Sequence, residues 1–439
     1  MRPLFFSILI SLLLAAWDTP FVMAQPERPP SQAEQKKGKN GPKQEEDKKE
    51  SSGEKKKGSP EKNSVKGQES PTTAPKPSSD PLDDYLNAPR RIALGKTPPM
   101  FGDWFRPGLQ LFSGSETPGG SNSMVSLVQI PLSARVGKVS ENNSALPYDR
   151  VFFNYNYFHN ALRGNAVGPV GSNSSAPSLE KYTLGWERTF LDGTASIESR
   201  FVISNTPDFV HNPLGPGPDG YETFNPTLGN LALIGKILLF ENASTALAAG
   251  TAIEVPTGGD TRIESGLSRL EIQNQAVYLA PHIGLLKKPT DSPWFANAFV
   301  QLETPLCGDR VRLVDPVSNT TNSIGNLTPQ TALFIDVAVG RWLHRQPGNW
   351  LSGAAALVEA HYNMGLNDSD SLTGAQNVGP FASAFTINPL AGRFNVLDLT
   401  AGLHLEIADR TRVRLGAVFP VGDEKPFDGE LGIQVSRYR

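Results

Sequence analysis

The chain has 439 residues and a formal net charge of −3, from 41 Lys and Arg and 44 Asp and Glu residues. This near balance provides no strong attraction to nucleic acid, so we expect no nucleic-acid partner. The single cysteine, Cys307, excludes an internal disulfide.

The first 24 residues have the features of a secretory signal peptide. Arg2 provides a positive start, an apolar run extends from Leu4 to Ala16, and Val22, Met23 and Ala24 form a small-residue cleavage pattern. The run is too short to cross a bilayer as a helix, and an uncleaved N-terminal anchor is the alternative. We therefore predict export through a cleaved signal peptide, residues 1–24.

Residues 25–80 are rich in Lys, Glu, Pro, Ser and Gly, and Val65 is the only large apolar residue among them. Such a segment cannot bury enough surface to offset the entropy of ordering it, so we predict a disordered periplasmic tail. The tail is either a solvated spacer or a tether that contacts the cell wall or anionic partners. Residues 81–105 predict one short helix and an aromatic segment that leads into the folded domain.

From residue 106 to residue 439 almost every element has the pattern of a strand. Leu397, Leu399 and Leu403 share one face of their segment, whereas Asp398 and His404 share the other. This period of two marks a strand that lies between an apolar and a polar environment. We predict 12 strands, near residues 149–160, 179–190, 194–204, 230–240, 243–256, 274–286, 293–304, 331–344, 350–364, 395–407, 411–420 and 428–438.

The connections between these strands alternate between short and long. Short links at 191–193, 241–242, 287–292, 345–349 and 408–410 alternate with long ones at 161–178, 205–229, 257–273, 305–330 and 365–394. Short turns at one end and long loops at the other are typical of outer-membrane barrels. The sequence therefore predicts an all-β fold, an antiparallel up-and-down transmembrane β-barrel with both termini on the periplasmic side. A soluble, exported β-rich binding module is the alternative, because antiparallel sheets with one wet face alternate in the same way.

Residues 106–137 complicate the strand count, because two stretches there also have extended patterns. They either add a hairpin to the wall, which gives 14 strands, or lie inside the lumen as a plug. We favour the hairpin.

Charged side chains gather on the less apolar face of the predicted strands. Because charges in a barrel wall are tolerated only toward water, this face is expected to line a hydrated interior. The candidates for lining the lumen are Glu187, Glu198, Arg200, Lys236, Glu254, Glu303, Asp336, Glu359, His361, Asp398, His404, Glu406, Arg412, Arg414 and Glu430. They either form cross-strand ion pairs or set a transverse field that biases which solutes pass.

No constellation of catalytic or metal-binding residues emerges from the sequence. A nucleophile elbow is missing, and the six histidines lack zinc-site spacing. His361 shares a strand face with Glu359, and His404 with Glu406, but two ligands on one strand favour a hydrated lumen over a metal site. We predict no catalytic residue, no metal and no cofactor, with a barrel-embedded lipase as the enzymatic alternative.

Aromatic residues near the predicted strand ends indicate a belt at the membrane interface. Trp294, Trp342 and Trp350 flank short turns, where a ring has one apolar and one wet neighbour.

Residues 139–158 (VSENNSALPYDRVFFNYNYF), with Phe101, Gly102, Asp103 and Trp104 upstream, resemble a family of uncharacterised exported proteins of planctomycete bacteria. The resemblance implies a Gram-negative-type envelope protein of unknown activity, with a transport or porin role suspected.

The sequence as a whole predicts a porin-like barrel of the cell outer membrane that passes or binds small solutes without catalysis. Outer-membrane lipid and small solutes are its expected partners.

Overall fold

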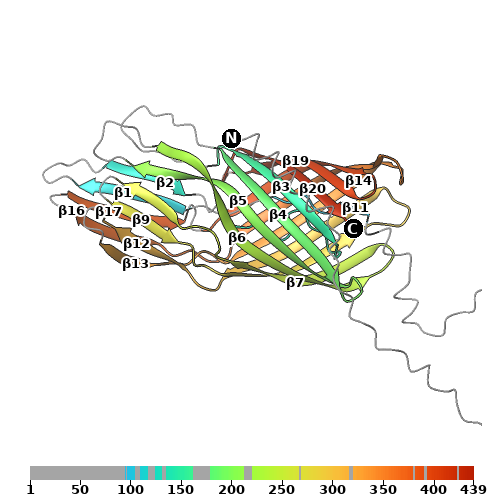
Figure 1. The fold of residues 1–439 in the computed structure, drawn as a ribbon, viewed down its shortest axis with the longest axis horizontal. Coiled ribbons are helices and arrows are strands. Elements are labelled where there is room, and N and C mark those ends of the chain that lie inside the picture. The colour runs from blue at the N-terminus through green and yellow to red at the C-terminus, as the bar shows by residue number, and fades with distance from the viewer. Residues whose placement is uncertain are drawn as a thin grey trace, which may run out of the picture. The chain divides into compact units, whose positions relative to one another are not determined.

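Twelve antiparallel strands form a closed wall (Figure 1). The computed structural model describes residues 94, 96–103, 109–116, 124–130, 135–161, 178–211, 220–265, 268–315, 320–378, 381–389, 393–422 and 425–439. The wall strands are β3 (Arg150–His159), β4 (Leu179–Phe190), β5 (Ala195–His211), β6 (Gly220–Glu241), β7 (Thr245–Val255), β10 (Tyr278–Lys287), β11 (Trp294–Pro305), β14 (Ala332–Arg345), β15 (Leu351–Gly365), β18 (Asn395–Ile407), β19 (Thr411–Val421) and β20 (Gly429–Tyr438). The last of these, β20, pairs with the first, β3, and this seam closes the barrel. The predicted 12-stranded up-and-down barrel is confirmed.

The described residues all belong to one compact unit that begins at Pro77. The predicted signal peptide, charged tail and short helix lie outside the described residues. No helix among the described residues is long and apolar enough to span a membrane.

Tight turns join the wall strands at one end, which we call the short-turn end. Leu191 and Asp192 between β4 and β5, and Ala408 and Asp409 between β18 and β19, have φ between 50° and 60°. Left-handed residues at successive turn positions match the right-handed twist of the flanking strands, so the hairpins close without splaying. The opposite end, where the connections are long, is the long-loop end.

The side chains of the wall are arranged in the opposite way to those of a soluble protein. On β14, Ile335 and Val337 are 36 and 46 % exposed on the outside, whereas Asp336 between them is 1 % exposed. Large apolar side chains are exposed in the same way on the other wall strands, and charged ones are buried. A soluble β-rich domain would place these residues the other way round, so the outer face is suited to lipid.

Two further groups of strands lie at the long-loop end (Figure 1). The first extends the wall sheet from β5 and consists of β8 (Thr261–Ser265), β9 (Ser268–Gln273), β12 (Asp309–Val314) and β13 (Thr321–Leu327). The second is a separate sheet in the order β16 (Leu372–Val378), β17 (Phe381–Pro389), β1 (Leu109–Glu116) and β2 (Met124–Ile130). We call these eight strands the loop sheets. Their shared core contains Ile263, Leu313 and Ile387.

The loop sheets correct two predictions. The connections at 257–273, 305–330 and 365–394 contain strands, although the sequence pattern predicted plain loops. The hairpin within 106–137 exists, but the interpretation that it enters the wall and gives 14 strands is wrong. Because β20 pairs with β3, the closed wall offers no edge, and β1 pairs with β17 instead.

Candidate functional site: a lumen filled by the chain itself

The inner face of the barrel carries the charged residues of the wall. All 15 predicted lumen candidates are buried, with at most 6 % exposure: Glu187, Glu198, Arg200, Lys236, Glu254, Glu303, Asp336, Glu359, His361, Asp398, His404, Glu406, Arg412, Arg414 and Glu430. Strand alternation explains this placement, because their neighbours along each strand point outward. Their polar groups meet other protein groups inside the barrel rather than bulk water.

Two segments that precede the wall in the chain lie inside the barrel. Residues 96–103, the ascending segment, start near the short-turn end, where Lys96 lies 3.8 Å from Asp409. Farther along, Asn297 of β11 donates to the carbonyl of Pro98 at 3.1 Å. The backbone N–H groups of Phe101 and Gly102 then donate to the two carboxylate oxygens of Glu359 on β15, each at 2.7 Å.

Residues 135–148, the descending segment, return toward the short-turn end and lead into β3. Arg135 contacts Glu254 and Glu303 near the long-loop end, each at 2.8 Å. Farther down, Lys236 of β6 donates to the carbonyl oxygens of Ser144 and Leu146 at 2.9 and 3.0 Å. The two segments also bond to each other, because Met100 N–H donates to the Asn143 carbonyl at 2.8 Å.

The ascending and descending segments together form what we call the plug. Its contacts reach β5, β6, β7, β11, β14, β15, β19 and β20, so it touches inward side chains around the barrel. The sequence left residues 106–137 as either a wall hairpin or a plug, and the structure places the plug at 96–103 and 135–148, so that the two ranges share residues 135–137. Most of the plug therefore lies outside the stretch for which a plug was the alternative.

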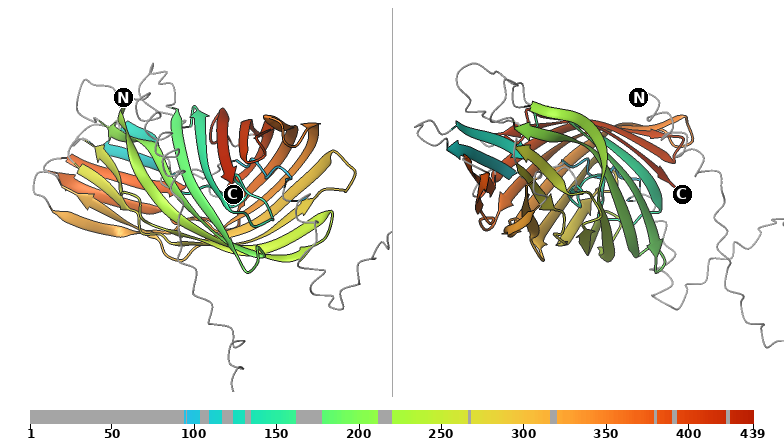
Figure 2. Two further views of the ribbon diagram at one scale, coloured as in Figure 1. Left: turned by 45° about the vertical axis from the view of Figure 1, so that its right-hand side comes forward. Right: turned by 60° about the vertical axis from the view of Figure 1, so that its left-hand side comes forward.

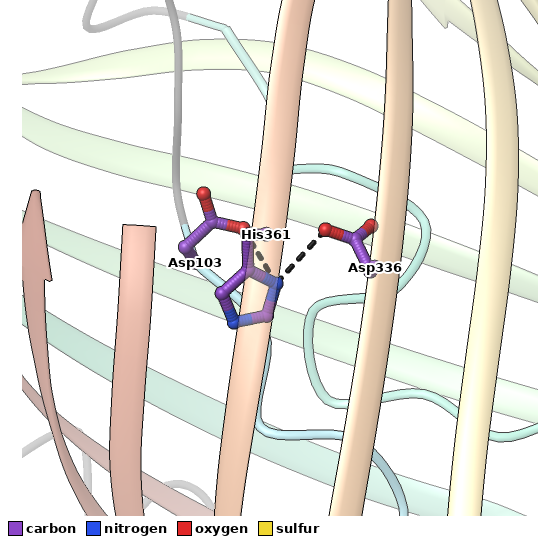
Figure 3. A group of neighbouring side chains, drawn as sticks. All are labelled: Asp103, Asp336 and His361. Atoms are coloured by element: carbon purple, nitrogen blue, oxygen red, sulfur yellow. Dashed lines mark hydrogen bonds and ion pairs between the residues drawn. The ribbon is translucent and has the colours of Figure 1, made fainter. Parts of the chain in front are cut away.

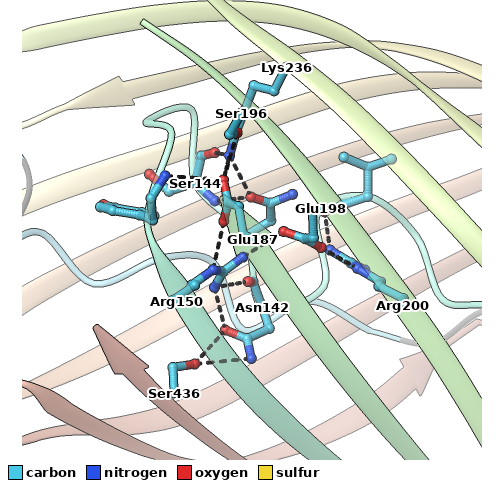
Figure 4. A network of polar contacts seen from close by, with 12 residues as sticks. Asn142, Ser144, Arg150, Glu187, Ser196, Glu198, Arg200, Lys236 and Ser436 are labelled. Atoms are coloured by element: carbon cyan, nitrogen blue, oxygen red, sulfur yellow. Dashed lines mark hydrogen bonds and ion pairs between the residues drawn. The ribbon is translucent and has the colours of Figure 1, made fainter. Parts of the chain in front are cut away.

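An ion-pair network fixes the lower part of the plug to the wall (Figure 4). Arg150 donates to Glu187 at 2.7 Å, to Glu198 at 2.8 Å and to the carbonyl oxygen of Asn142 at 2.6 Å. Lys236 lies 3.1 Å from the same Glu187 carboxylate. Each buried charge has an opposite charge beside it, which is the condition under which burial of ions is tolerated.

A second cluster joins the upper part of the plug to β14 and β15 (Figure 3). His361 Nδ1 lies 2.8 Å from Asp336 and 3.3 Å from Asp103 of the ascending segment. Lys138 bonds to both of these carboxylates and donates to Asn363 at 2.9 Å. Burial lowers the pKa of Lys138, but Asp103 and Asp336 outweigh it and raise that pKa above its ordinary value. The ammonium group therefore stays charged.

Asp103, Asp336 and His361 are close enough together to ligate a metal ion. The Lys138 ammonium group, however, bonds to both aspartates and supplies the positive charge that they require. This cluster is best described as an internal ion-pair network.

The two predicted His–Glu pairs have different surroundings. His361 Nε2 lies 3.3 Å from Glu359 and 3.0 Å from the Thr400 hydroxyl, within the Lys138 cluster. His404 lies 3.9 Å from Glu406 and packs edge-on against Trp342. The predicted cross-strand pairing holds for Glu406 and Arg412, which are 3.3 Å apart.

The aromatic belt is only partly as predicted. Trp294 and Trp350 are 51 and 75 % exposed at the short-turn end. Trp342, which was expected beside them, is 7 % exposed and points inward, because it shares the inward phase of Asp336 along β14. Its ring packs against that of Phe295, with the ring centres 6.3 Å apart.

Sequence reasoning missed several inward residues. Arg150 and Lys181 lie on the inner face of β3 and β4, and the same alternation would have found them. Arg135, Lys138 and Glu141 of the descending segment lie in irregular backbone, where no periodicity marks a buried face. Only the density of polar residues without a turn pattern could have drawn attention to that segment.

A closed wall, an apolar outer face and a charged inner face together define a transmembrane β-barrel of the outer-membrane type. The plug makes it a barrel whose lumen is filled by its own chain.

Comparison with solved structures finds similar chains at 9–10 % sequence identity. An outer membrane channel from Pseudomonas putida F1 is 10 % identical, with 67 % of this chain and 96 % of that chain covered and a TM-score of 0.43. The β domain of the Bordetella autotransporter BrkA is 10 % identical, with 67 and 99 % covered and a TM-score of 0.37. The Pseudomonas putida toluene transporter TodX is 9 % identical, with 79 and 92 % covered and a TM-score of 0.34. No protein-family model and no curated protein matches the chain.

Proposed function

We propose that the protein is a porin-like barrel of the outer membrane that passes or binds small solutes in its lumen, without catalysis. The observation that carries the proposal is the width of the lumen. It holds the ascending and descending segments side by side, joined by the bond from Met100 to Asn143. An interior that accommodates two stretches of chain has room for a small solute once those stretches shift.

The contacts of the plug suit a closed state that can be opened. They combine apolar packing, such as that of Phe101 and Val139 against wall residues, with hydrogen bonds and ion pairs that water and a polar solute can replace. Solute entry therefore requires rearrangement of the plug, and the wall stays intact.

The proposal also includes parts that rest on the sequence. Residues 1–24 would direct export, the tail would remain in the periplasm as a spacer or tether, and the long-loop end would face outside. The resemblance of residues 139–158 supports membership of the planctomycete envelope family. Lipid would surround the exposed apolar face of the wall.

Reconstitution into liposomes and planar bilayers tests the function. The wild-type barrel is expected to show low conductance, and the Lys236→Gln/Arg414→Gln variant a higher one. These two residues donate to six backbone carbonyls or side-chain oxygens of the plug, and the variant removes those charged donors. A shift in gel mobility on heating establishes that each variant is folded. Folded variants that admit neither ions nor small sugars would contradict the proposal.

A further inference from the structure

The charges on the inner wall are divided between two halves of the barrel. Six neighbouring strands, β7, β10, β11, β14, β15 and β18, carry six buried carboxylates, those of Glu254, Glu303, Asp336, Glu359, Asp398 and Glu406. Among the described residues of these strands, no Lys or Arg is buried on the inner face, and the buried Lys288 follows β10 directly at the short-turn end. Where the structure describes their side chains, the other six strands carry Arg150, Lys181, Arg200, Lys236, Arg412 and Arg414 with three buried carboxylates, Glu187, Glu198 and Glu430. We call the two sets the acidic half and the basic half.

The plug complements both halves. The basic half donates to its backbone: Arg414 to the carbonyl of Met100 at 2.7 Å, and Arg200 to the carbonyl of Lys138 at 2.8 Å. The acidic half receives instead the two cationic side chains of the descending segment, Arg135 and Lys138. The positive charge that the acidic half lacks in its own strands thus comes from the plug.

The Arg135 site has the construction of a receptor for a planar cation. Glu254 accepts from Nε and Glu303 from Nη2, so two carboxylates hold two edges of the guanidinium group. The Tyr278 ring covers its face, with the guanidinium carbon 3.2 Å from the ring centre. Charge-assisted bonds at the edges and an aromatic face are the two interactions that select guanidinium over a simple ion.

Two amide side chains also bond to the carboxylates of this site and fix their positions. Asn230 donates to the same Glu254 oxygen at 2.8 Å, and Gln301 donates to Glu303 at 3.4 Å. The site is also at the long-loop end, because Tyr278 begins β10 and Glu254 is the penultimate residue of β7.

Deeper in the acidic half, a carboxylate oxygen has no hydrogen-bond partner. Asp398 is fully buried, Asn363 donates to its Oδ2 at 3.1 Å, and its Oδ1 is unpartnered among the described residues. Asn363 also bonds to Asp103, so Asp398 adjoins the Lys138 cluster.

We propose that the long-loop half of the lumen recognises the guanidinium or primary ammonium group of a small solute, and that Arg135 and Lys138 occupy its sites as built-in substitutes. The solute would exchange with Arg135 between Glu254, Glu303 and Tyr278, so that the upper end of the plug is released as the solute binds. The exchange makes and breaks no covalent bond. It rests on the proposed function, since it requires solutes to enter the barrel.

Chemical rescue tests the Arg135 site directly. In the Arg135→Ala variant, ethylguanidinium chloride at millimolar concentration is expected to raise the melting temperature by several degrees, because it refills the vacated site. Ethylurea, which has nearly the same shape without the charge, is expected to have no effect. If the variant refolds poorly, the yield of refolded barrel with each compound replaces the melting temperature as the readout.

Two further variants make the rescue specific. Adding Glu254→Gln and Glu303→Gln to Arg135→Ala removes the negative charge and should abolish the rescue. Lys236→Ala disturbs the plug in the basic half and leaves Arg135 in place, so ethylguanidinium should not stabilise it. Equal stabilisation of all variants, or none of Arg135→Ala, would overturn the inference.

Ion selectivity separates this inference from the proposed function. The Arg135→Ala/Lys138→Ala variant in a planar bilayer should prefer potassium over chloride, measured as the reversal potential in a salt gradient. Conduction without cation preference and without rescue would refute the inference and leave the channel function standing. Rescue of Arg135→Ala by ethylguanidinium, without any conduction or uptake in the opened variants, would contradict the channel function and leave the recognition of the cation standing.

Discussion

The barrel wall and the loop sheets use the same alternation of side chains and orient it in opposite directions. In the wall, Arg150 and Asp336 are buried and Val337 is exposed. In the loop sheets, Ile272 and Leu313 are buried in a shared core, and Thr321 on the edge strand β13 is exposed. A period of two specifies a strand with two unlike faces, and the surrounding solvent decides which face turns inward.

The comparison predicts that the wall is most sensitive to loss of a buried charge. Arg150→Ala leaves Glu187 and Glu198 without the arginine that bonds to both, and breaking a buried pair in this way costs about 3–5 kcal/mol. Urea unfolding in detergent micelles, followed by tryptophan fluorescence, measures the loss. Arg188→Ala is the matched control, because Arg188 is largely exposed and its pair with Asp149 contributes about 0–1 kcal/mol. Equal losses of stability in both variants would contradict a special dependence of the wall on the charges buried at its inner face.

A charge on the outer face of the wall should cost somewhat less. Val337 is near the middle of β14 and exposed to the proposed lipid, so Val337→Arg is expected to destabilise the barrel in bilayers by about 2–4 kcal/mol. Thr321→Arg in the loop sheets should have almost no effect, because that position faces water. Refolding titrations into lipid vesicles measure both. A harmless arginine at position 337 would contradict burial of that face in a membrane.

The core of the loop sheets should respond to a single methyl group. Ile272→Val removes one carbon from this core and is expected to cost about 0.5–1.5 kcal/mol, confined to the loop sheets. Faster proteolysis of the long-loop end, with unchanged heat-dependent gel mobility of the barrel, is the expected result. A change in the gel mobility would show that the two regions unfold together.

The smallest effect expected is that of alkaline pH on Lys138, whose ion pairs with Asp103 and Asp336 join the plug to β14. Its pKa is raised in the folded protein, because the carboxylates of Asp103 and Asp336 outweigh burial. The stability that it contributes is fully present below the unfolded value of about 10.4 and is lost only as the pH rises through the higher folded pKa. Conductance of the wild-type barrel should therefore stay low from about pH 7 to about pH 10, whereas Lys138→Gln should conduct throughout. Opening of the wild-type barrel between about pH 7 and about pH 10 would contradict a charged Lys138 that holds the plug.

The wall was predictable because each of its strands alternates strongly over about ten residues. The predicted span 395–407 coincides with β18, and 411–420 falls one residue short of β19. The strands β8 and β9 were missed because they are only five and six residues long, and a window of that length carries few alternations. Closure of β20 on β3, which excludes a 14-stranded wall, is a long-range pairing that no local pattern encodes.

The plug could not be predicted in the same way. Arg135 and Lys138 look like ordinary surface residues in a polar stretch, and their burial depends on carboxylates more than 100 residues away in the chain. The sequence showed which wall residues face inward, but not which residues of the plug they contact. Sequence reasoning therefore placed the charges of the lumen and missed the segment that neutralises them.

The path of the plug constrains the order of assembly. The chain ascends inside the barrel to Asp103, forms β1 and β2 paired with β17 at the long-loop end, and descends again from Arg135 into β3. Because β1 and β2 are attached to β17 at the long-loop end, the closed ring of wall strands encloses a chain that is anchored outside the ring. The seam between β3 and β20 must therefore close around the threaded chain, as its N-terminal part cannot be inserted afterwards without undoing those strands.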